Sequence, residues 1–434
     1  MNHGRIRWVD RYVGSSLCFG LTLVRRVGDL FGGRRRALLP PSKILFIKLI
    51  EQGATVLAYG AIKRAVAKVG RENVYFCVFA ENRAIFDLLE LVPPENVIEI
   101  RSDGMLVFAI DALRVLVRCR REKIDTTIDM EFMARAPAIL AYCSGARRRV
   151  GLHRFTTEGP YRGDLMTDRI LPNPFIHTAE HYSLLVHVLD APPEETPRGK
   201  MPVAEIEAPA PRFEPSSEER ERLTQVIESE VGGRVGGPIV LLNPNASDLL
   251  PLRRWQPDRF VELGRRLLAE QPEVTVAITG APSERSAAET IAAAIGEAPR
   301  VISLAGKTSL RDLLVLYSVA DVLVTNDSGP GHFASLTEIH NIVLFGPASV
   351  TGWGPRGGRH HVIRADLACS PCVDSMNNRL SPCNDNVCMQ AIGVNQVYEA
   401  VAACLAQDEA AGPTTRRRRA VPASRSTRKT TQQP

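Results

Sequence analysis

Strand-like and helix-like segments alternate twice along this chain of 434 residues, and that alternation limits the folds it can adopt. Short apolar runs are separated by segments in which apolar residues recur every third or fourth position. This pattern predicts parallel sheets with helices on both faces, which is an α/β fold. The predicted strands cover 43–49, 74–80, 97–100 and 126–130 in the first half, and 238–244, 274–280, 301–306, 321–326 and 341–346 in the second. A single helical pattern over 53–69 follows the first strand.

The two halves are separated by a segment rich in proline and poor in large apolar residues, which predicts a linker over 191–217. We therefore expect an N-terminal domain over 41–190 and a C-terminal domain over 218–408. Two α/β domains joined in this way enclose a cleft, and ligands of open α/β sheets bind at the carboxyl ends of the strands. A basic amphipathic segment (1–40) and a disordered basic tail (409–434) are expected to flank the two domains.

The net charge of +6 is concentrated at the two ends of the chain. Residues 1–43 contain nine Lys and Arg against two acids, and residues 410–434 contain seven and no acid, which leaves −8 for the stretch between them. Solvated ends and contact with an anionic surface both fit this distribution. The C-terminal tail has no aromatic residue for stacking on bases, so we expect no nucleic-acid partner.

The segment from Trp8 to Phe31 carries an amphipathic helical pattern. Such a helix lies either in a membrane interface or on the protein's own body, and both alternatives are open. Arg34–Arg36 favour a membrane with anionic headgroups. The apolar run over 13–24 is too short to span a bilayer, and neither a cleavable signal nor a disulfide framework is visible. We therefore expect a cytoplasmic protein, peripheral at the membrane. The helical stripe comprises Val9, Val13, Leu17, Leu21, Val24, Val27 and Phe31, with Arg7, Arg11, Arg25 and Arg26 nearby.

The stretch TNDSGPGH (325–332) places an acid, two glycines and a histidine directly after a predicted strand. Small residues let the backbone approach a ligand closely, and the N–H groups at a helix N-terminus attract phosphate. Asp327 can fix this loop or hold a ligand hydroxyl. The alternative is that Asp327 or Ser328 is an ordinary N-cap and that His332 is merely exposed. The residues expected to hold a diphosphate here are Ser328, Gly329, Gly331 and His332.

Two further strand ends carry polar residues that suit a ligand. NPNASDLLPLRRWQPDRF (243–260) follows one strand, and its arginines can neutralise a diphosphate through bidentate contacts. Glu284 follows the glycine turn after strand 274–280 and can accept a ribose hydroxyl. Solvated arginines and a helix-start acid remain open as alternatives. The predicted donor-binding residues are Asn243, Asn245, Ser247, Arg253, Arg254, Glu284, Asp327, Ser328, Gly329, Gly331 and His332.

Four cysteines gather near the end of the second half, at Cys369, Cys372, Cys383 and Cys388. Four thiols so close in sequence either hold a structural zinc or remain reduced in a packed loop. Because the spacing departs from two C-x2-C pairs, we assign no metal ligand.

Residues 43–405 resemble glycosyltransferase family 9, the lipopolysaccharide heptosyltransferase-like enzymes. The resemblance rests on D-x-G-x-x-H at Asp327, Gly329 and His332, on IVLFGP (342–347), on RRWQPDRF (253–260) and on KLIEQGATVLAYGAIKRA (48–65). It implies the GT-B architecture, in which two Rossmann-like doubly wound domains face a cleft. It also implies inverting transfer of a sugar from a nucleotide diphosphate donor, typically ADP-heptose, with the donor on the C-terminal domain.

The resemblance further implies an acceptor on the N-terminal domain, namely a lipopolysaccharide core or a related glycolipid. The enzyme would then work at the cytoplasmic face of the inner membrane. It would need no cofactor, because a helix terminus and arginines hold the phosphates. GARRRVGLHRF (145–155) offers cations to an anionic glycolipid.

One position departs from the family pattern. The first helix of the family usually opens with Gly-Asp, whose carboxylate is taken as the base, whereas here Gly53 is followed by Ala54. An attacking sugar hydroxyl benefits from a carboxylate that accepts its proton, and Glu51 is the nearest acid. We assign Glu51 as the catalytic base. The alternatives are that Glu51 is a helix-start acid, and that the chain is an inactive GT-B-like protein that binds a sugar nucleotide or glycolipid.

Overall fold

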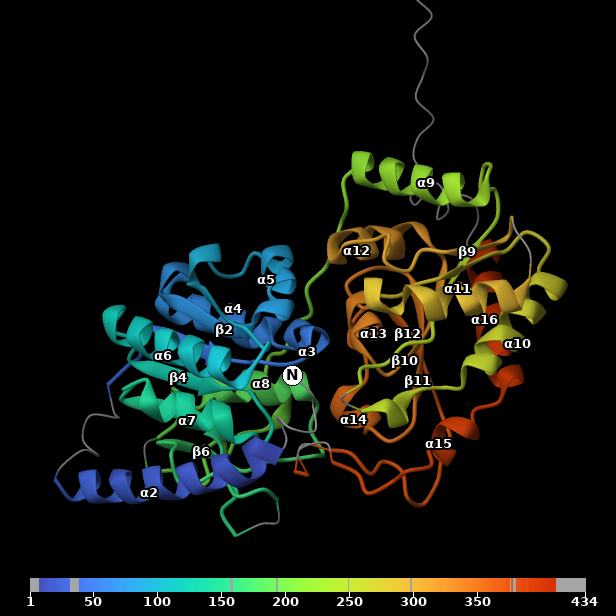
Figure 1. Cartoon of the computed structure of the whole chain (residues 1–434). Coiled ribbons are helices and arrows are strands. Elements are labelled where there is room, and N and C mark those ends of the chain that lie inside the picture. Colours follow the sequence, from blue (N-terminus) through green and yellow to red (C-terminus); the bar gives the residue numbers. More distant parts are fainter. Residues whose placement is uncertain are drawn as a thin grey trace, which may run out of the picture.

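Two six-stranded parallel sheets form the centre of the computed structural model (Figure 1), which describes residues 8–31, 39–156, 159–192, 194–248, 250–296, 299–374, 376–377 and 380–410. The first sheet comprises β1 (Ile44–Ile47), β2 (Val74–Phe79), β3 (Val97–Ile100), β4 (Thr126–Asp129), β5 (Arg148–Leu152) and β6 (Asp168–Ile170). The second comprises β7 (Ile239–Asn243), β8 (Thr275–Ile278), β9 (Val301–Ser303), β10 (Val322–Asn326), β11 (His340–Phe345) and β12 (Arg359–Arg364). The predicted α/β class with parallel sheets is therefore confirmed.

Both sheets have the same topology. The strand order is β3-β2-β1-β4-β5-β6 in the first sheet and β12-β11-β10-β7-β8-β9 in the second, which is the doubly wound order twice. The order reverses between β1 and β4 in one sheet and between β7 and β10 in the other. Crevices for ligands form at these reversal points, beyond the carboxyl ends of the strands.

Helices cover both faces of the first sheet. Residues alternate along β1, so that Ile44 and Phe46 belong to one apolar core and Leu45 and Ile47 to the other. One face carries α3 (Gln52–Leu57), α4 (Tyr59–Val69), α5 (Ala84–Leu89) and α8 (Thr178–His187), and the other carries α2 (Ser15–Leu30), α6 (Met105–Arg121) and α7 (Arg135–Cys143). The second sheet is accompanied by α9 (Ser217–Val231), α10 (Pro257–Glu270), α11 (Arg285–Ile295), α12 (Leu310–Val319), α13 (Gly329–Ala334), α14 (Val350–Trp353), α15 (Val387–Gln390) and α16 (Val394–Ala410).

The single helix predicted over 53–69 is wrong, because the structure divides it into α3 and α4 at Ala58. The backbone N–H of Ala58 bonds to the carbonyl of Thr55 at 3.0 Å, three residues back, which tightens the turn. Gly60 then passes close to the linker, where a Cβ atom would lie 2.9 Å from Cδ of Pro209. The break therefore lets α4 begin against the linker.

Three strands, β5, β6 and β12, were not predicted, because their arginines and histidines interrupt the apolar pattern. In β5 the guanidinium of Arg148 is buried and lies 2.9 Å from the carboxylate of Asp168 in β6. It also donates to the carbonyl oxygens of Leu189 and Val188. The expectation that this part of 145–155 offers cations to a glycolipid is therefore wrong for Arg148.

The predicted linker is tied to both domains. Arg198 forms an ion pair with Asp168 at 3.0 Å, and its backbone forms an isolated parallel β-bridge with Ile170. The start of the linker therefore belongs with the first sheet. The N–H of Phe213 donates to the carbonyl of Leu336 at 2.8 Å, which fixes the end of the linker to the second domain. The proposed domain limits remain a prediction.

The N-terminal segment forms a π-helical turn over Asp10–Gly14 that continues into α2. It lies on the first domain beside α7, as the body-docked alternative expects, with Asp10 accepting hydrogen bonds from the N–H groups of Arg135 and Ala136. Among the described residues, no helix is long and apolar enough to cross a membrane. Arg34–Arg36 and nearly all of the predicted tail (411–434) lie outside the described residues.

A buried ion pair at the reversal point of the first sheet is expected to contribute strongly to stability. Asp129, which ends β4, pairs with Arg162, and both side chains are almost fully buried. Asp129→Ala leaves an unpaired buried guanidinium, so we expect it to lower the free energy of unfolding by about 3–5 kcal/mol. Urea unfolding followed by circular dichroism measures this loss.

Asp190→Ala provides the matched control. Asp190 also pairs with cations, Lys68 and Arg64, but its side chain is half exposed. Water solvates such a pair well, so we expect a loss of no more than about 1 kcal/mol. Equal losses in the two variants would contradict the assignment of Asp129 as a structural anchor.

Candidate active site

The reversal points of the two sheets face each other through the starts of α3 and α13. A Cβ atom built on Gly53 would lie 2.7 Å from Cα of Gly329 and 3.1 Å from Cδ2 of His332. Only glycine at position 53 therefore allows the present distance between the two loops. The contact brings the loop that carries Glu51 against the loop that carries Asp327, so the structure unites the predicted acceptor and donor sides.

Asparagines hold the end of β7 in place. The side-chain amide of Asn243 donates to the hydroxyl of Thr279 at 3.1 Å, and that of Asn245 donates to the Thr279 carbonyl at 3.3 Å. Asn326, which ends β10, donates to the carbonyl of Pro244 and accepts the N–H of Trp255 at 3.0 Å. Sequence reasoning missed both Thr279 and Asn326, although each is a polar residue at or next to the end of a strand.

The structure separates the two adjacent arginines of the RRW motif. Arg253 is largely buried and places Nη1 3.7 Å from the carboxylate of Asp327. Arg254 turns toward its own loop, donating to the carbonyl of Ala246 and pairing with Asp248. Of the two, Arg253 therefore has the position to meet a ligand between the domains.

Four of the predicted donor residues have a buried polar atom with no hydrogen-bond partner among the described residues. Buried polar atoms are nearly always paired, so such atoms gathered in one place indicate a site that a polar ligand completes. The atoms are Oδ1 of Asn243, Nε of Arg253, Oδ2 of Asp327 and Nδ1 of His332.

The loop before α13 has the backbone that the sequence predicts. Ser328 is extended at the N-cap, its hydroxyl donating to the carbonyl of Asn326 at 3.1 Å, and Gly329 and Gly331 lie in the first turn. His332 is buried in the same short helix, so the alternative of an exposed histidine is wrong. Of the first three residues of α13, Pro330 has no N–H and the N–H of Gly331 donates to the carbonyl of Ser328 at 3.2 Å, so the N–H of Gly329 is the one left for an anion.

Glu284 and Ser247 differ from the buried donor residues in their surroundings. The carboxylate of Glu284 accepts the N–H of Ala281 at 2.7 Å and so caps its own turn, as the alternative of a helix-start acid expects. Gly280 lies between Glu284 and Asn245. A Cβ atom built on Gly280 would lie 2.9 Å from Nδ2 of Asn245 and 3.2 Å from the Glu284 carboxylate. Ser247 is exposed.

Glu51 has a backbone conformation that is rare for its residue type, with φ 68° and ψ 89°. Side chains other than glycine adopt positive φ at a cost, and such residues gather at functional sites. Beneath it, Glu131 accepts the N–H of Ile50 at 3.0 Å and pairs with the buried ammonium group of Lys48 at 3.2 Å. This pair, which sequence reasoning missed, supports the loop that carries Glu51.

Among the described residues the four clustered cysteines do not form a group of metal ligands. The thiol of Cys372 lies 3.2 Å from the hydroxyl of Ser381, and that of Cys383 donates to the carbonyl of Asp385 at 3.0 Å. Cys388 is buried, and burial raises the pKa of its thiol, while Cys372 and Cys383 lie near enough for their charges to raise that pKa further. The assignment of no metal ligand to this cluster stays a prediction.

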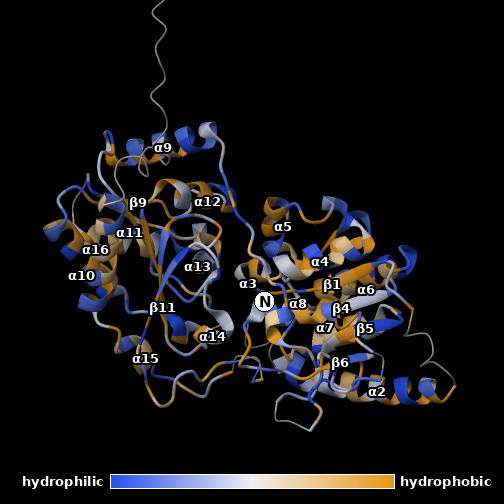
Figure 2. Ribbon diagram, turned by 180° about the vertical axis from the view of Figure 1, so that it is seen from behind, coloured by the Kyte–Doolittle hydropathy of each residue, from blue (hydrophilic) through white to orange (hydrophobic). Residues whose placement is uncertain are grey.

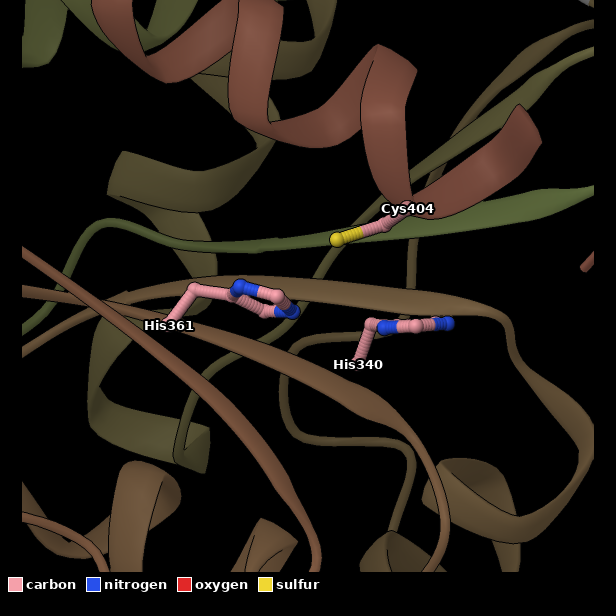
Figure 3. A group of neighbouring side chains, drawn as sticks. All are labelled: His340, His361 and Cys404. Carbon is pink, nitrogen blue, oxygen red and sulfur yellow. The ribbon is translucent and has the colours of Figure 1, made fainter. Parts of the chain in front are cut away.

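A different group of metal-type side chains, His340, His361 and Cys404, lies at the amino edge of the second sheet (Figure 3), away from the cleft. One donor atom of each lies within 4.8 Å of the others. A divalent metal accepts such ligands, but Nη1 of Arg359 lies 2.8 Å from Nε2 of His340 and 2.6 Å from Asp408. A guanidinium this close opposes a cation, so we assign no metal to the group.

A comparison with protein families identifies the chain. The family model of glycosyltransferase family 9 (heptosyltransferase) matches residues 113–381, which are more than half of the sequence. The chain belongs to glycosyltransferase family 9. The family expected from the motifs is thereby confirmed.

Relatives within family 9 include lipooligosaccharide heptosyltransferase 2 of Campylobacter jejuni, 26% identical over 167 residues, which cover 38% of this chain and 51% of the relative. Lipopolysaccharide heptosyltransferase 2 of Escherichia coli is 30% identical over 129 residues, which cover 29% of this chain and 36% of the relative. The matched stretches thus span about half, or less, of these relatives.

Solved structures of the family share the fold. The ADP-heptose lipopolysaccharide heptosyltransferase II of E. coli superposes with a TM-score of 0.62 and 20% identity, covering 85% of this chain and 99% of that one. A family 9 protein from Veillonella parvula superposes with a TM-score of 0.62 and 18% identity, covering 84% and 97%. With the two doubly wound sheets, these likenesses confirm the GT-B architecture.

Three buried histidines, His177, His181 and His332, are expected to make stability depend on pH. Burial lowers their pKa values, to about 4 for His177 and His181 and to about 3 for His332. The unfolded state binds more protons than the folded state below the unfolded pKa near 6.5, so the free energy of unfolding falls as pH decreases from there toward 4.

His181→Leu tests this dependence. His181 packs against Phe132, and neither ring nitrogen has a partner among the described residues. Each such histidine contributes a slope of about 1.4 kcal/mol per pH unit, so the variant is expected to reduce the slope by that amount between roughly pH 6 and 4.5. Urea unfolding at several pH values measures it, with His360→Leu at an exposed position as the companion variant. An unchanged slope in His181→Leu would contradict the burial of a neutral imidazole.

Proposed function

We propose that the protein is an inverting glycosyltransferase that moves a sugar, heptose from ADP-heptose, onto a lipopolysaccharide core or a related glycolipid. Membership of family 9 supports the reaction class, and the names of the relatives support the sugar and the acceptor. The observation that carries the proposal is the group of buried polar atoms at the carboxyl edge of the second sheet, opposite Glu51, that have no hydrogen-bond partner among the described residues.

The donor occupies the C-terminal domain in this proposal. The N–H of Gly329 at the start of α13, with Arg253 and His332, holds the diphosphate as negative charge builds on the leaving group. Asp327 holds the loop and accepts from a sugar hydroxyl. Burial raises the pKa of the Asp327 carboxyl, and the nearby Arg253 opposes that rise.

The acceptor lies on the N-terminal domain, with its hydroxyl between Glu51 and the anomeric carbon. Glu51 accepts the hydroxyl proton as the oxygen bonds to the anomeric carbon, and the nucleotide diphosphate leaves from the opposite face. Attack from the face opposite the leaving group inverts the anomeric centre. The reaction needs no metal or other cofactor, and a lipid-linked acceptor places it at the cytoplasmic face of the inner membrane.

A second candidate is a non-catalytic protein that binds the sugar nucleotide, which the alanine at position 54 favours. Incubation with ADP-heptose and a lipid acceptor truncated before the heptose separates the two. Transfer of heptose supports the enzyme. Tight donor binding without transfer supports the binding protein.

Glu51→Gln removes the proposed base without changing the size of the side chain. General-base catalysis typically contributes two to four orders of magnitude, so we expect kcat to fall about 100- to 10,000-fold while ADP affinity stays unchanged. Transfer assays and calorimetry measure the two quantities. Glu72→Gln, an exposed acid ahead of β2, is the control. Wild-type kcat in Glu51→Gln would show that another group accepts the proton.

Arg253→Gln and Arg254→Gln test the separation of the two arginines. A hydrogen bond to a charged group contributes about 1.5–3 kcal/mol, so loss of the Arg253 contact is expected to weaken ADP binding by about tenfold or more. Arg254 already has the Ala246 carbonyl and Asp248 as partners, and its substitution is expected to change ADP affinity less than about threefold. Titration calorimetry measures both, and equal effects would contradict the assignment of Arg253 alone.

A further inference from the structure

Helix α2 docks on the first domain through its small and polar residues. Cys18 and Thr22 are buried, and the hydroxyl of Thr22 accepts the N–H of Asp164 at 2.8 Å. Arg25 pairs with both Asp29 and Asp164. These contacts fix which side of the helix faces the protein.

The side of α2 that faces away from the protein is therefore apolar. Phe19, Leu23 and Val27 follow one another at helical spacing, and their exposed fractions are 59%, 49% and 55%. A docked helix normally turns its apolar stripe toward the core, so this arrangement is inverted. Figure 2 shows apolar colours along α2 at the lower edge of the first domain.

Helix α6 presents a second apolar strip. It lies on the same face of the first sheet as α2, with α7 between them (Figure 1), so their outward sides face the same direction. Of 22 exposed large apolar side chains among the described residues, ten lie over 8–31 and five lie in α6. Such a concentration marks an interaction surface. The five in α6 are Met105, Leu106, Ile110, Leu113 and Val117.

In residues 8–31 and in α6, acids and cations lie on different sides of the helices. Every acid over 8–31 and in α6 faces the protein in an ion pair, namely Asp10 with Arg135, Asp29 with Arg25, and Asp111 with Arg101 and Arg114. The exposed charged residues of the two segments are all cations. They are Arg11, Arg26, Arg114, Arg120 and Arg121.

We propose that the outward sides of residues 8–31 and of α6 form one surface, the α2–α6 surface, that binds a bilayer containing anionic lipids. Apolar side chains enter the interfacial region while the arginines meet the headgroups. A second copy of the chain fits less well, because a symmetric contact would bring the same cations together.

The surface begins next to the cleft. Asp10 pairs with Arg135, the first residue of α7, which follows the carboxyl end of β4 at the reversal point of the first sheet. A bilayer on this surface would therefore present lipid-linked molecules beside Glu51. The inference rests on α2 and α6 alone and does not depend on the proposed sugar transfer.

The test is cosedimentation of the full chain with phosphatidylcholine vesicles that contain or lack phosphatidylglycerol. The wild-type protein is expected to bind the anionic vesicles, less strongly at high salt. Phe19→Ser/Leu23→Ser/Val27→Ser is expected to lower the partition coefficient at least tenfold. Arg11→Gln/Arg26→Gln/Arg121→Gln is expected to remove the preference for anionic vesicles. ADP affinity, unchanged in both variants, reports that the cleft remains folded.

The matched control removes apolar surface elsewhere, with Phe175→Ser/Val203→Ser/Leu380→Ser at three other exposed positions. It is expected to bind vesicles like the wild type. The proposal is overturned if the wild-type protein does not sediment, or if the α2 variant sediments equally, which would assign binding to another segment. A wild-type dimer that the α2 variant dissociates, without vesicle binding, would show a second copy to be the occupant.

Discussion

The close approach of Gly53 and Gly329 determines how the two domains meet. Each glycine lies at the start of a helix that follows a central strand of its sheet, and a Cβ on Gly53 would lie 2.7 Å from Gly329 Cα. Each reversal point carries two loops, and these glycines let the loop after β1 of the first sheet touch the loop after β10 of the second. That contact brings Glu51 of the first domain toward Asp327 and Arg253 of the second. The candidate site therefore depends on the two domains being this close.

The same first domain uses its two faces for different purposes. The face with α3, α4, α5 and α8 shares one continuous apolar core with residues of the second domain, including Phe333 and Trp353. The opposite face has a separate core beneath α2, α6 and α7. Contacts at the cleft and contacts at the α2–α6 surface thus depend on different cores, and each can be altered without direct loss of packing in the other.

Much of this architecture could be predicted from the sequence, because parallel strands buried on both faces appear as apolar runs with polar residues at their ends. TNDSGPGH and the segment after β7 were placed at one site for that reason. β5 and β6 were missed because Arg148 is buried through an ion pair with Asp168, and β12 was missed because its arginines and histidines interrupt the apolar pattern. The different orientations of Arg253 and Arg254 depend on Ala246 and Asp248, and the periodicity of 8–31 could not show which side meets the protein. Helical spacing defines a stripe, whereas polar contacts such as Thr22 with Asp164 determine the direction it faces.

The conformation of Glu51 bears on the absence of a carboxylate at position 54. A non-glycine residue at positive φ costs roughly 1–3 kcal/mol and persists only where its surroundings hold it. Here those surroundings are visible: the N–H of the preceding Ile50 is held by Glu131, which is in turn held by Lys48, and Gly53 is held against the second domain. An ordinary helix-start acid needs no such support, since an extended backbone serves an N-cap well. The strain is therefore accounted for more simply if the loop serves to place the Glu51 carboxylate at the cleft than if Glu51 only begins α3.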